Sequence, residues 1–254
     1  MTGYNYLGKY PHNPWFAFHK PDRKSNLKGF TMARYTRLQV YDAMLTTGLV
    51  PLFYQDDPDV AQEIVKAVSG GGARVLEFTN RGEKALPVFS QLNTFIEKSK
   101  LPIILGVGSV IDAPTAALYL AHGANFIVGP LFNPEVARLC NRRKIAYLPG
   151  CATVAEISTA EESGVEIVKV FPGETVGGPA FIKAVLGPMP WSRLMPTGGV
   201  EATRESVQSW IKAGACCVGL GSNLVRKDWV AAGNYSSMQE TTAFILQWII
   251  ESKK

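Results

Sequence analysis

Cysteine and histidine are scarce in this sequence, and their scarcity excludes several kinds of site. The chain has 254 residues but only four cysteines and three histidines. The cysteines show no CxxC spacing and are too few for a disulfide scaffold, so reduced thiols and a cytoplasmic location are expected. The histidines, His12, His19 and His122, form no HxH or HExxH pattern. A metal site is therefore not expected.

Long apolar runs and a strong charge of one sign are missing too. No stretch of about 18 or more apolar residues occurs, so no membrane-spanning helix is expected. The first residues also lack the apolar core of a signal peptide. The formal charge of +5 suits an anionic metabolite. No helix-turn-helix, zinc-finger or RNP-like pattern accompanies this charge, so no nucleic-acid partner is expected.

The sequence divides into a short extension and one large domain. Residues 1–33 are rich in Tyr, Phe, Trp, Asn, Pro and Lys and lack a clear period, which predicts an extension. With 46% hydrophobic residues, the chain can bury a substantial core. No linker or internal repeat interrupts residues 34–254, so a single domain is expected there.

Within that domain, short apolar runs alternate with longer stretches of helical periodicity, which predicts parallel βαβ units. Eight strands in about 170 residues favour a (β/α)8 barrel, closed by a C-terminal helix. A doubly wound sheet is the alternative, although no GxGxxG follows the first strand. The expected strands are 49–54, 74–79, 102–106, 125–128, 145–148, 166–171, 193–196 and 216–220. The expected helices are 34–47, 58–69, 83–99, 112–122, 133–143, 153–163, 178–186, 203–213 and 237–251.

A lysine interrupts one of the expected buried strands. Side chains alternate along a strand, so Ile167, Lys169 and Phe171 share one face. Lysine is rarely buried without a partner or a function. If Lys169 faces a barrel interior, desolvation favours its neutral amine, which can attack a carbonyl and form a Schiff base. The alternative is a lysine that extends from an edge to water.

A glutamate interrupts another expected strand. Glu77, Thr79 and Arg81 have the same parity and can line one side of a cavity. A buried carboxylate can act as a general acid or base, and an arginine can bind a carboxylate through two hydrogen bonds. A structural ion pair of Glu77 with Arg81 or Lys169 is the alternative. That pair is compatible with catalysis, because it would tune both groups.

Glycine-rich segments follow the last two expected strands. Pro196-Thr197-Gly198-Gly199 follows the seventh strand, and Gly219-Leu220-Gly221-Ser222 follows the eighth. In barrels, the loops at these positions often bind phosphate through backbone N–H groups, which glycine allows an anion to approach closely. The pair of motifs therefore predicts a phosphate site.

Several ordered motifs, from about Gly48 to Val225, carry a resemblance to a known family. The motifs are GGARVLEFTNRG (71–82), GVGSV (106–110), PGCATVAE (149–156), VKVFPGE (168–174), PTGG (196–199) and GLGSNLV (219–225). With them the chain resembles the class I 2-keto-3-deoxy-6-phosphogluconate (KDPG) aldolases, also described as 4-hydroxy-2-oxoglutarate (KHG) aldolases. These are carbon–carbon lyases that are typically homotrimers.

The resemblance implies a role for each matching residue. It places the Schiff base on Lys169 and proton transfer on Glu77, with no separate cofactor and no metal. It implies contacts to a small anionic 2-keto acid substrate from Arg81, Ser109, Pro130, Thr153, Phe171 and Thr197. It implies a phosphate site at Gly198, Gly199, Gly221 and Ser222.

Three departures from the family pattern leave the substrate open. Ser109 replaces a threonine, Gly129 replaces a serine before Pro130, and Asp56 and Asp57 end the first strand without the basic residue of some members. The expected reaction is cleavage of KDPG to pyruvate and glyceraldehyde 3-phosphate, and also of 4-hydroxy-2-oxoglutarate to pyruvate and glyoxylate. One alternative is the same mechanism on the galactonate epimer or another 2-keto-3-deoxy acid. The other is a non-catalytic barrel that binds a phosphorylated metabolite.

Overall fold

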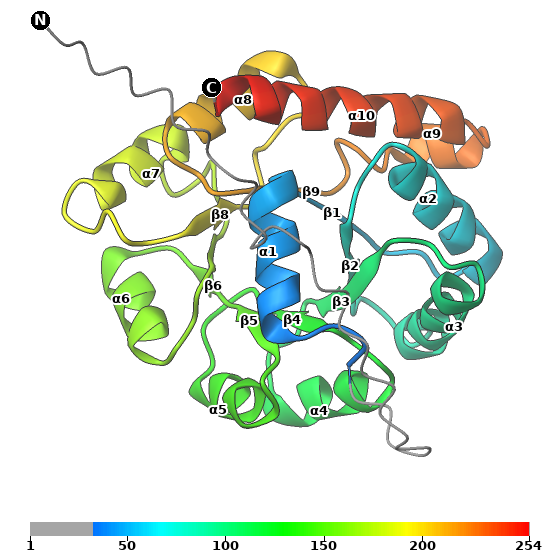
Figure 1. Ribbon diagram of the computed structural model, residues 1–254, viewed down its shortest axis with the longest axis horizontal. Coiled ribbons are helices and arrows are strands. Elements are labelled where there is room, and N and C mark those ends of the chain that lie inside the picture. Colours follow the sequence, from blue (N-terminus) through cyan, green and yellow to red (C-terminus); the bar gives the residue numbers. More distant parts are fainter. Residues whose placement is uncertain (1–32, 254) are drawn as a thin grey trace, which may run out of the picture. The chain divides into compact units, whose positions relative to one another are not determined.

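Strands and helices alternate through residues 33–253, the part of the chain that the computed structural model describes (Figure 1). The extension expected at residues 1–33 lies almost wholly outside the described residues. The strands are β1 Leu49–Phe53, β2 Val75–Thr79, β3 Ile104–Gly108, β4 Phe126–Val128, β5 Ala146–Leu148, β6 Gly150–Cys151, β7 Val168–Val170, β8 Leu194–Pro196 and β9 Val218–Leu220. The helices are α1 Arg37–Thr47, α2 Pro58–Gly70, α3 Ala85–Lys98, α4 Ala113–Ala121, α5 Pro134–Arg143, α6 Val154–Glu162, α7 Gly178–Leu186, α8 Arg204–Lys212, α9 Lys227–Ala231 and α10 Tyr235–Ser252.

The strands pair in parallel in two sheets, so the α/β class is as expected. One sheet has the order β5-β4-β3-β2-β1-β9 and the other the order β6-β7-β8. A parallel bridge between Thr197 and Gly219 joins the ends of β8 and β9. Sequential strands are neighbours, and the order does not reverse in the middle as it does in a doubly wound sheet. The alternative fold, a doubly wound sheet, is therefore excluded.

Most helices begin at a side chain that caps the first turn, because the first N–H groups of a helix have no partner inside it. This explains why several expected helices start one residue early: the predicted first residue is the cap. The capping residues are Thr36, Asp57, Asp112, Asn133, Thr153, Thr203 and Asn234.

The third strand is two residues later than expected, and the prediction of 102–106 was wrong at both ends. Ile104–Gly108 pairs with Val75–Thr79 along its whole length. Glycine weakens a strand in isolation, so the segment Gly106-Val107-Gly108 reads as a loop from the sequence. The two glycines are required by their neighbours, because a Cβ on Gly106 would overlap the Phe126 ring and one on Gly108 would overlap Glu77.

Two short elements were missed. The strand β6 follows β5 after Pro149, and Gly150 pairs with Lys169 of β7. Proline has no N–H for the ladder, so the strand is interrupted there. The helix α9 has only five residues, too few to show a helical period.

The core lies on two sides of the strands. In Figure 1 the helices α2–α8 and α10 surround the strands, and α1 lies across the middle of the view. Val40, Tyr41 and Met44 of α1 pack against Val75 and Phe126 at the amino ends of β2 and β4. The helix α1 thus covers the amino ends of the strands, which leaves their carboxyl ends for a site.

Candidate functional site

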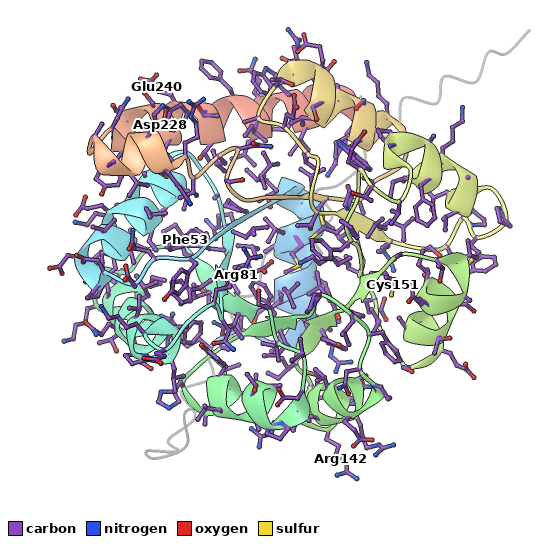
Figure 2. The ribbon with its side chains drawn as sticks, turned by 180° about the vertical axis from the view of Figure 1, so that it is seen from behind. Phe53, Arg81, Arg142, Cys151, Asp228 and Glu240 are labelled. Atoms are coloured by element: carbon purple, nitrogen blue, oxygen red, sulfur yellow. The ribbon has the colours of Figure 1, made fainter. Side chains whose placement is uncertain are left out.

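A cavity of about 450 Å³ lies at the carboxyl ends of β1, β2, β8 and β9. Arg81 lies near the middle of this face of the molecule (Figure 2). Many of the expected site residues line the cavity: Arg81, Phe171, Thr197, Gly198, Gly199, Gly221 and Ser222. Residues that the sequence reasoning did not single out line it as well, among them Tyr54, Asn223 and Lys227.

Lys169 lies at the centre of β7 and is 6% exposed. Its neighbours Val168 and Val170 belong to the core between strands and helices, whereas Ile167 belongs to the core beside α1. The expected alternation is therefore confirmed, and Lys169 faces away from the helices. Its Nζ lies 4.9 Å from the centre of the Phe171 ring, which lines the cavity. Lys169 thus lies just below the cavity.

Glu77 lies at the centre of β2 and is 1% exposed. Its Oε2 is buried without a hydrogen-bond partner among the described residues. Burial raises the pKa of the Glu77 carboxyl, and the charges of Lys169 and Arg81 oppose that rise. A carboxyl group with a raised pKa can exchange a proton near neutral pH, as a general acid or base must.

The alternative for Glu77, a structural ion pair with Arg81 or Lys169, is not observed in residues 33–253. Among the ion pairs within 4.0 Å in residues 33–253, none includes Glu77, Lys169 or Arg81. Burying a carboxylate without a partner is costly, and such groups are concentrated at functional sites.

Arg81 follows β2 and Ser109 follows β3, and the two side chains meet. The Arg81 Nε donates to the Ser109 Oγ at 3.3 Å. Ser109 has a φ of 59°, in the left-handed region that residues other than glycine rarely adopt. Strained backbone of this kind is typical of functional sites. The guanidinium is exposed to the cavity and has N–H groups left to bind an anion.

The two glycine-rich segments form one wall of the cavity, as the sequence predicts. Gly198 and Gly199 have φ values of 85° and 86°, so both need glycine. Thr197 is 5% exposed, and its Oγ1 has no partner among the described residues. An orphaned hydroxyl beside a cavity is suited to a polar ligand.

Pro130 and Thr153 do not line the cavity. The carbonyl group of Pro130 lies against Gly150, where a Cβ would overlap it. Thr153 caps α6, and its Oγ1 accepts from the Glu156 N–H and donates to the Glu156 Oε2. The side chain of Thr153 is therefore occupied by a structural role.

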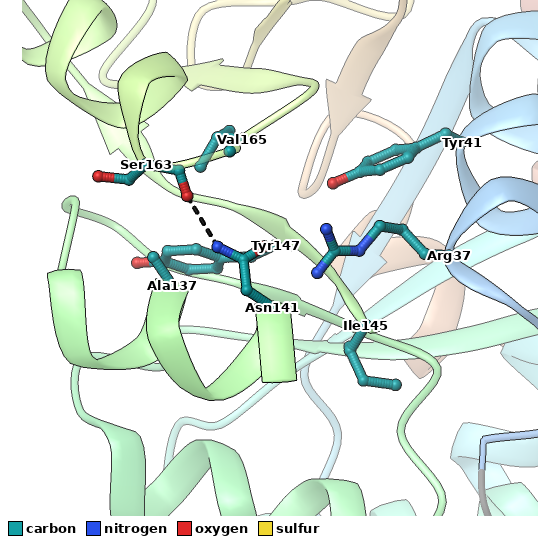
Figure 3. Close-up of a pocket in the computed structure, with 9 residues that line it drawn as sticks. Arg37, Tyr41, Ala137, Asn141, Ile145, Tyr147, Ser163 and Val165 are labelled. Carbon is teal, nitrogen blue, oxygen red and sulfur yellow. Dashed lines mark hydrogen bonds between the residues drawn. The ribbon is translucent and has the colours of Figure 1, made fainter. Parts of the chain in front are cut away.

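A small gap between α1 and α5, at the other end of the strands, offers no volume to a molecule the size of water (Figure 3). Arg37 extends into this gap and donates to the Cys140 carbonyl at 2.9 Å, and Asn141 donates to the Ser163 carbonyl at 2.8 Å. The first contact ties α1 to α5, and the second ties α5 to the end of α6. The gap is not a ligand site.

Three further findings concern residues 33–253 alone. No three His, Cys, Asp or Glu side chains in this part of the chain come close enough to hold a metal ion. No helix there is long and apolar enough to cross a membrane. All four cysteines lie in this part and are free thiols.

Comparison with known proteins points to one family. A family model described as "Aldolase: KDPG and KHG aldolase" matches residues 40–241. A KHG/KDPG aldolase of Escherichia coli K12 is 32% identical over 195 residues, which is 76% of this chain and 89% of that protein. A KDPG aldolase from Legionella pneumophila, with pyruvate captured at low pH as a covalent carbinolamine intermediate, has a TM-score of 0.73 and 25% identity over 80% of this chain and 96% of that one. A native KDPGal structure has a TM-score of 0.68 and 27% identity over 81% and 95%.

Proposed function

The chain belongs to the KDPG and KHG aldolase family, and from this premise we propose that it cleaves KDPG to pyruvate and glyceraldehyde 3-phosphate through a Schiff base on Lys169. The observation that carries the proposal is a buried primary amine, 6% exposed, whose Nζ lies beside a ring that lines the cavity. Membership of an aldolase family disfavours the non-catalytic alternative.

The mechanism begins with addition of the Lys169 amine to the C2 carbonyl. The nitrogen lone pair forms the C–N bond, the C=O π electrons move to oxygen, and a proton passes from the nitrogen to that oxygen to give a carbinolamine. Glu77 delivers the proton that lets this hydroxyl leave as water, which yields an iminium ion. The raised pKa of Glu77, caused by its burial, supports this role, because burial favours the protonated carboxyl group.

The iminium ion then accepts the electrons of the C3–C4 bond. The C4 hydroxyl gives its proton to the carboxylate that Glu77 became in the dehydration, glyceraldehyde 3-phosphate leaves, and an enamine remains. Return of that proton to C3 of the enamine, followed by addition of water to the iminium carbon, releases pyruvate and regenerates the amine. With 4-hydroxy-2-oxoglutarate the same steps give pyruvate and glyoxylate.

The remaining side chains are proposed to hold the two ends of the substrate. Arg81, oriented by Ser109, binds the carboxylate of the pyruvoyl part. Phe171, which lines the cavity, bounds the site of the keto acid. Thr197 binds the substrate hydroxyls, which is supported by its orphaned Oγ1. The phosphate is bound by the glycine-rich wall of the cavity, which consists of Gly198, Gly199, Gly221 and Ser222.

We also infer that the two sheets close into a complete (β/α)8 barrel, in which β5 and β6 form one interrupted strand. Three contacts support closure. The Thr197–Gly219 bridge links β8 to β9, β9 pairs with β1, and the Gly150 N–H donates to the Gly129 carbonyl beyond β4 at 3.0 Å. Residues 34–254 are proposed as one domain. A homotrimer in the cytoplasm is proposed on the family pattern.

The test is reduction by borohydride in the presence of pyruvate, followed by peptide mapping. We expect one pyruvate-derived adduct per chain on Lys169 and none in Lys169→Met. The exposed Lys183 of α7 is the matched control, and Lys183→Met should form the adduct as the wild type does. An unmodified Lys169 at saturating pyruvate would overturn the proposal.

A second candidate is the same cleavage of the galactonate epimer. It is favoured by the similarity to the KDPGal structure and by Asp56 and Asp57 at the end of β1, where some family members have a basic residue. The values of kcat/KM for the two epimers decide between the candidates. A strong preference for the gluconate epimer would reject the second one.

A further inference from the structure

We propose that Lys227 supplies the cation for the distal anionic group of the substrate and so selects phosphorylated over unphosphorylated sugar acids. This inference rests on the aldolase function proposed above. It assigns a residue that none of the motifs contains. Lys227 is the first residue of α9, the short helix that the sequence did not reveal.

Lys227 and Arg81 come from different elements, since Lys227 begins α9 and Arg81 follows β2. Both side chains line the same cavity. Arg81 lies near the middle of this face, whereas Asp228, the next residue to Lys227, lies at its edge (Figure 2). Lys227 lines the cavity together with Ser222 and Asn223. Two cations from different elements suit a substrate that has an anion at each end.

The charge of Lys227 is not neutralised by the part of the protein that the structure describes. No Asp or Glu oxygen of residues 33–253 forms an ion pair with it. The adjacent Arg226 cannot take its place, because Arg226 donates to both carboxylate oxygens of Asp228, at 3.0 and 2.7 Å. Among the described residues, Arg81 and Lys227 are the cations of the lining, and none of the lining residues is acidic.

The end of β1 offers no competing cation. Asp57 caps α2 by accepting from the N–H groups of Asp59 and Val60. Asp56 lies 3.8 Å from Lys84 at the exposed surface. Without Lys227, the glycine-rich wall would bind a phosphate dianion through neutral N–H and O–H donors alone. A charged donor strengthens such binding considerably.

The loop that carries Lys227 is fixed to the glycine-rich wall. The Asn223 Nδ2 donates to the Val200 carbonyl at 2.9 Å, which ties the segment after β9 to the segment after β8. The Leu224 and Val225 N–H groups donate to the Gly221 carbonyl, both at 2.9 Å. These bonds hold the backbone beside Lys227 and the Gly198–Gly199 segment in one frame.

A neighbouring cavity that shares Lys227 helps to decide on which side of this lysine an anion binds. Ser222, Asn223 and Lys227 also line this second cavity of about 580 Å³, whose other walls include Glu201 and Asp228. Arg226 also lines the second cavity and pairs with Asp228, whereas Glu201 has no ion-pair partner among residues 33–253. The unpaired carboxylate of Glu201 repels an anion, and Lys227 lines both cavities. The phosphate is therefore expected on the inner side of Lys227.

The test compares Lys227→Ala and Lys227→Gln with the wild type. The KM for KDPG should rise about tenfold or more, the loss expected for one charge-assisted hydrogen bond. Competitive inhibition by inorganic phosphate should weaken by a similar factor. Formation of the borohydride-trapped pyruvate adduct should fall far less, because pyruvate has no distal anion. Lys212→Ala, which removes an exposed lysine from the end of α8, is the matched control.

An unchanged KM for KDPG and unchanged phosphate inhibition would overturn the assignment of Lys227. An equal loss of pyruvate trapping would also overturn it, because that result indicates general damage. Failure of the aldolase proposal has a different signature, since the wild type itself would form no adduct. In that case, direct binding of inorganic phosphate to the wild type and to Lys227→Ala still tests whether Lys227 binds the anion.

Discussion

The Glu77 carboxylate occupies the space that a side chain on Gly108 would fill. The two residues lie in adjacent strands, where Glu77 pairs with Gly106 and Thr79 pairs with Gly108. A Cβ built on Gly108 would overlap both the Oε1 and the carboxyl carbon of Glu77. The glycine therefore sets where this buried carboxyl group lies.

We predict that Gly108→Ala lowers kcat/KM about 100-fold, because a displacement of about 1 Å in a catalytic group can cost that much. Steady-state kinetics and the rate of pyruvate adduct formation measure the loss. Gly187→Ala is the control, since a Cβ there makes only an ordinary contact of 3.4 Å with the Ala184 carbonyl. A fully active Gly108→Ala enzyme would show that the position of Glu77 does not matter.

The buried carboxyl group also predicts a dependence of stability on pH. Burial raises the pKa of Glu77 above its ordinary 4.5, so the folded protein keeps this proton where the unfolded chain has lost it. The stability from this group is complete below pH 4.5 and falls as the pH rises through the raised pKa. Glu77→Gln cannot ionise. We therefore expect the stability of Glu77→Gln relative to wild type to increase between about pH 4 and neutral pH.

Urea unfolding over this pH range measures the difference. The exposed residue Glu97, at the end of α3, provides the control, and Glu97→Gln should follow the wild type at each pH. A constant difference between Glu77→Gln and wild type across the range would contradict the raised pKa. Glu77→Gln should lose turnover at every pH, because the amide cannot transfer the proton.

Arg81 is expected to act through its fork of N–H groups and not through charge alone. Lysine keeps the charge but cannot bind a carboxylate through two parallel hydrogen bonds, nor reach Ser109 in the same way. We predict that Arg81→Lys raises the KM for the keto acid by about tenfold or more. Arg138→Lys on α5, where the arginine pairs with Glu135 at the surface, is the control. An unchanged KM would show that Arg81 does not bind the carboxylate of the keto acid.

The helix α1 is expected to be an integral part of the domain. Met44 is fully buried against the amino ends of the strands, whereas Leu38 of the same helix is 78% exposed. We predict that Met44→Ala lowers the free energy of unfolding by about 2–5 kcal/mol. Leu38→Ala should change it by less than about 0.5 kcal/mol. Denaturant unfolding of the two variants measures this, and equal effects would mean that α1 does not close the core.

The sequence predicts this fold well where the local pattern and the tertiary contacts agree. Apolar runs such as 49–54 and 125–128 become strands, because both faces of a parallel strand are buried. It fails at Gly106–Gly108, since strand formation there depends on the side chains of Glu77 and Phe126 in neighbouring strands. Contacts of this kind cannot be seen in a local pattern.

The candidate site, like the fold, can be predicted only in part from the sequence. Lys169 and Glu77 can be proposed as site residues from the sequence, because a charged residue inside an apolar strand is conspicuous. Lys227 is missed, because it lies in a polar segment after the last strand and only the folded chain brings it to the cavity. Thr153 shows the opposite error, since its motif predicts a residue that lines the site, whereas its hydroxyl caps α6.

Thr197 offers a test in which stability and activity should change in opposite directions. Its Oγ1 is buried without a partner among the described residues, and such a group destabilises the folded state. Valine has the same shape without the hydroxyl. We predict that Thr197→Val raises the free energy of unfolding by up to about 1 kcal/mol and lowers kcat/KM about tenfold. Thr159→Val on α6, where the hydroxyl donates to the Ala155 carbonyl, is the control for the substitution itself. If Thr197→Val loses stability and keeps its activity, the hydroxyl serves the fold and not the substrate.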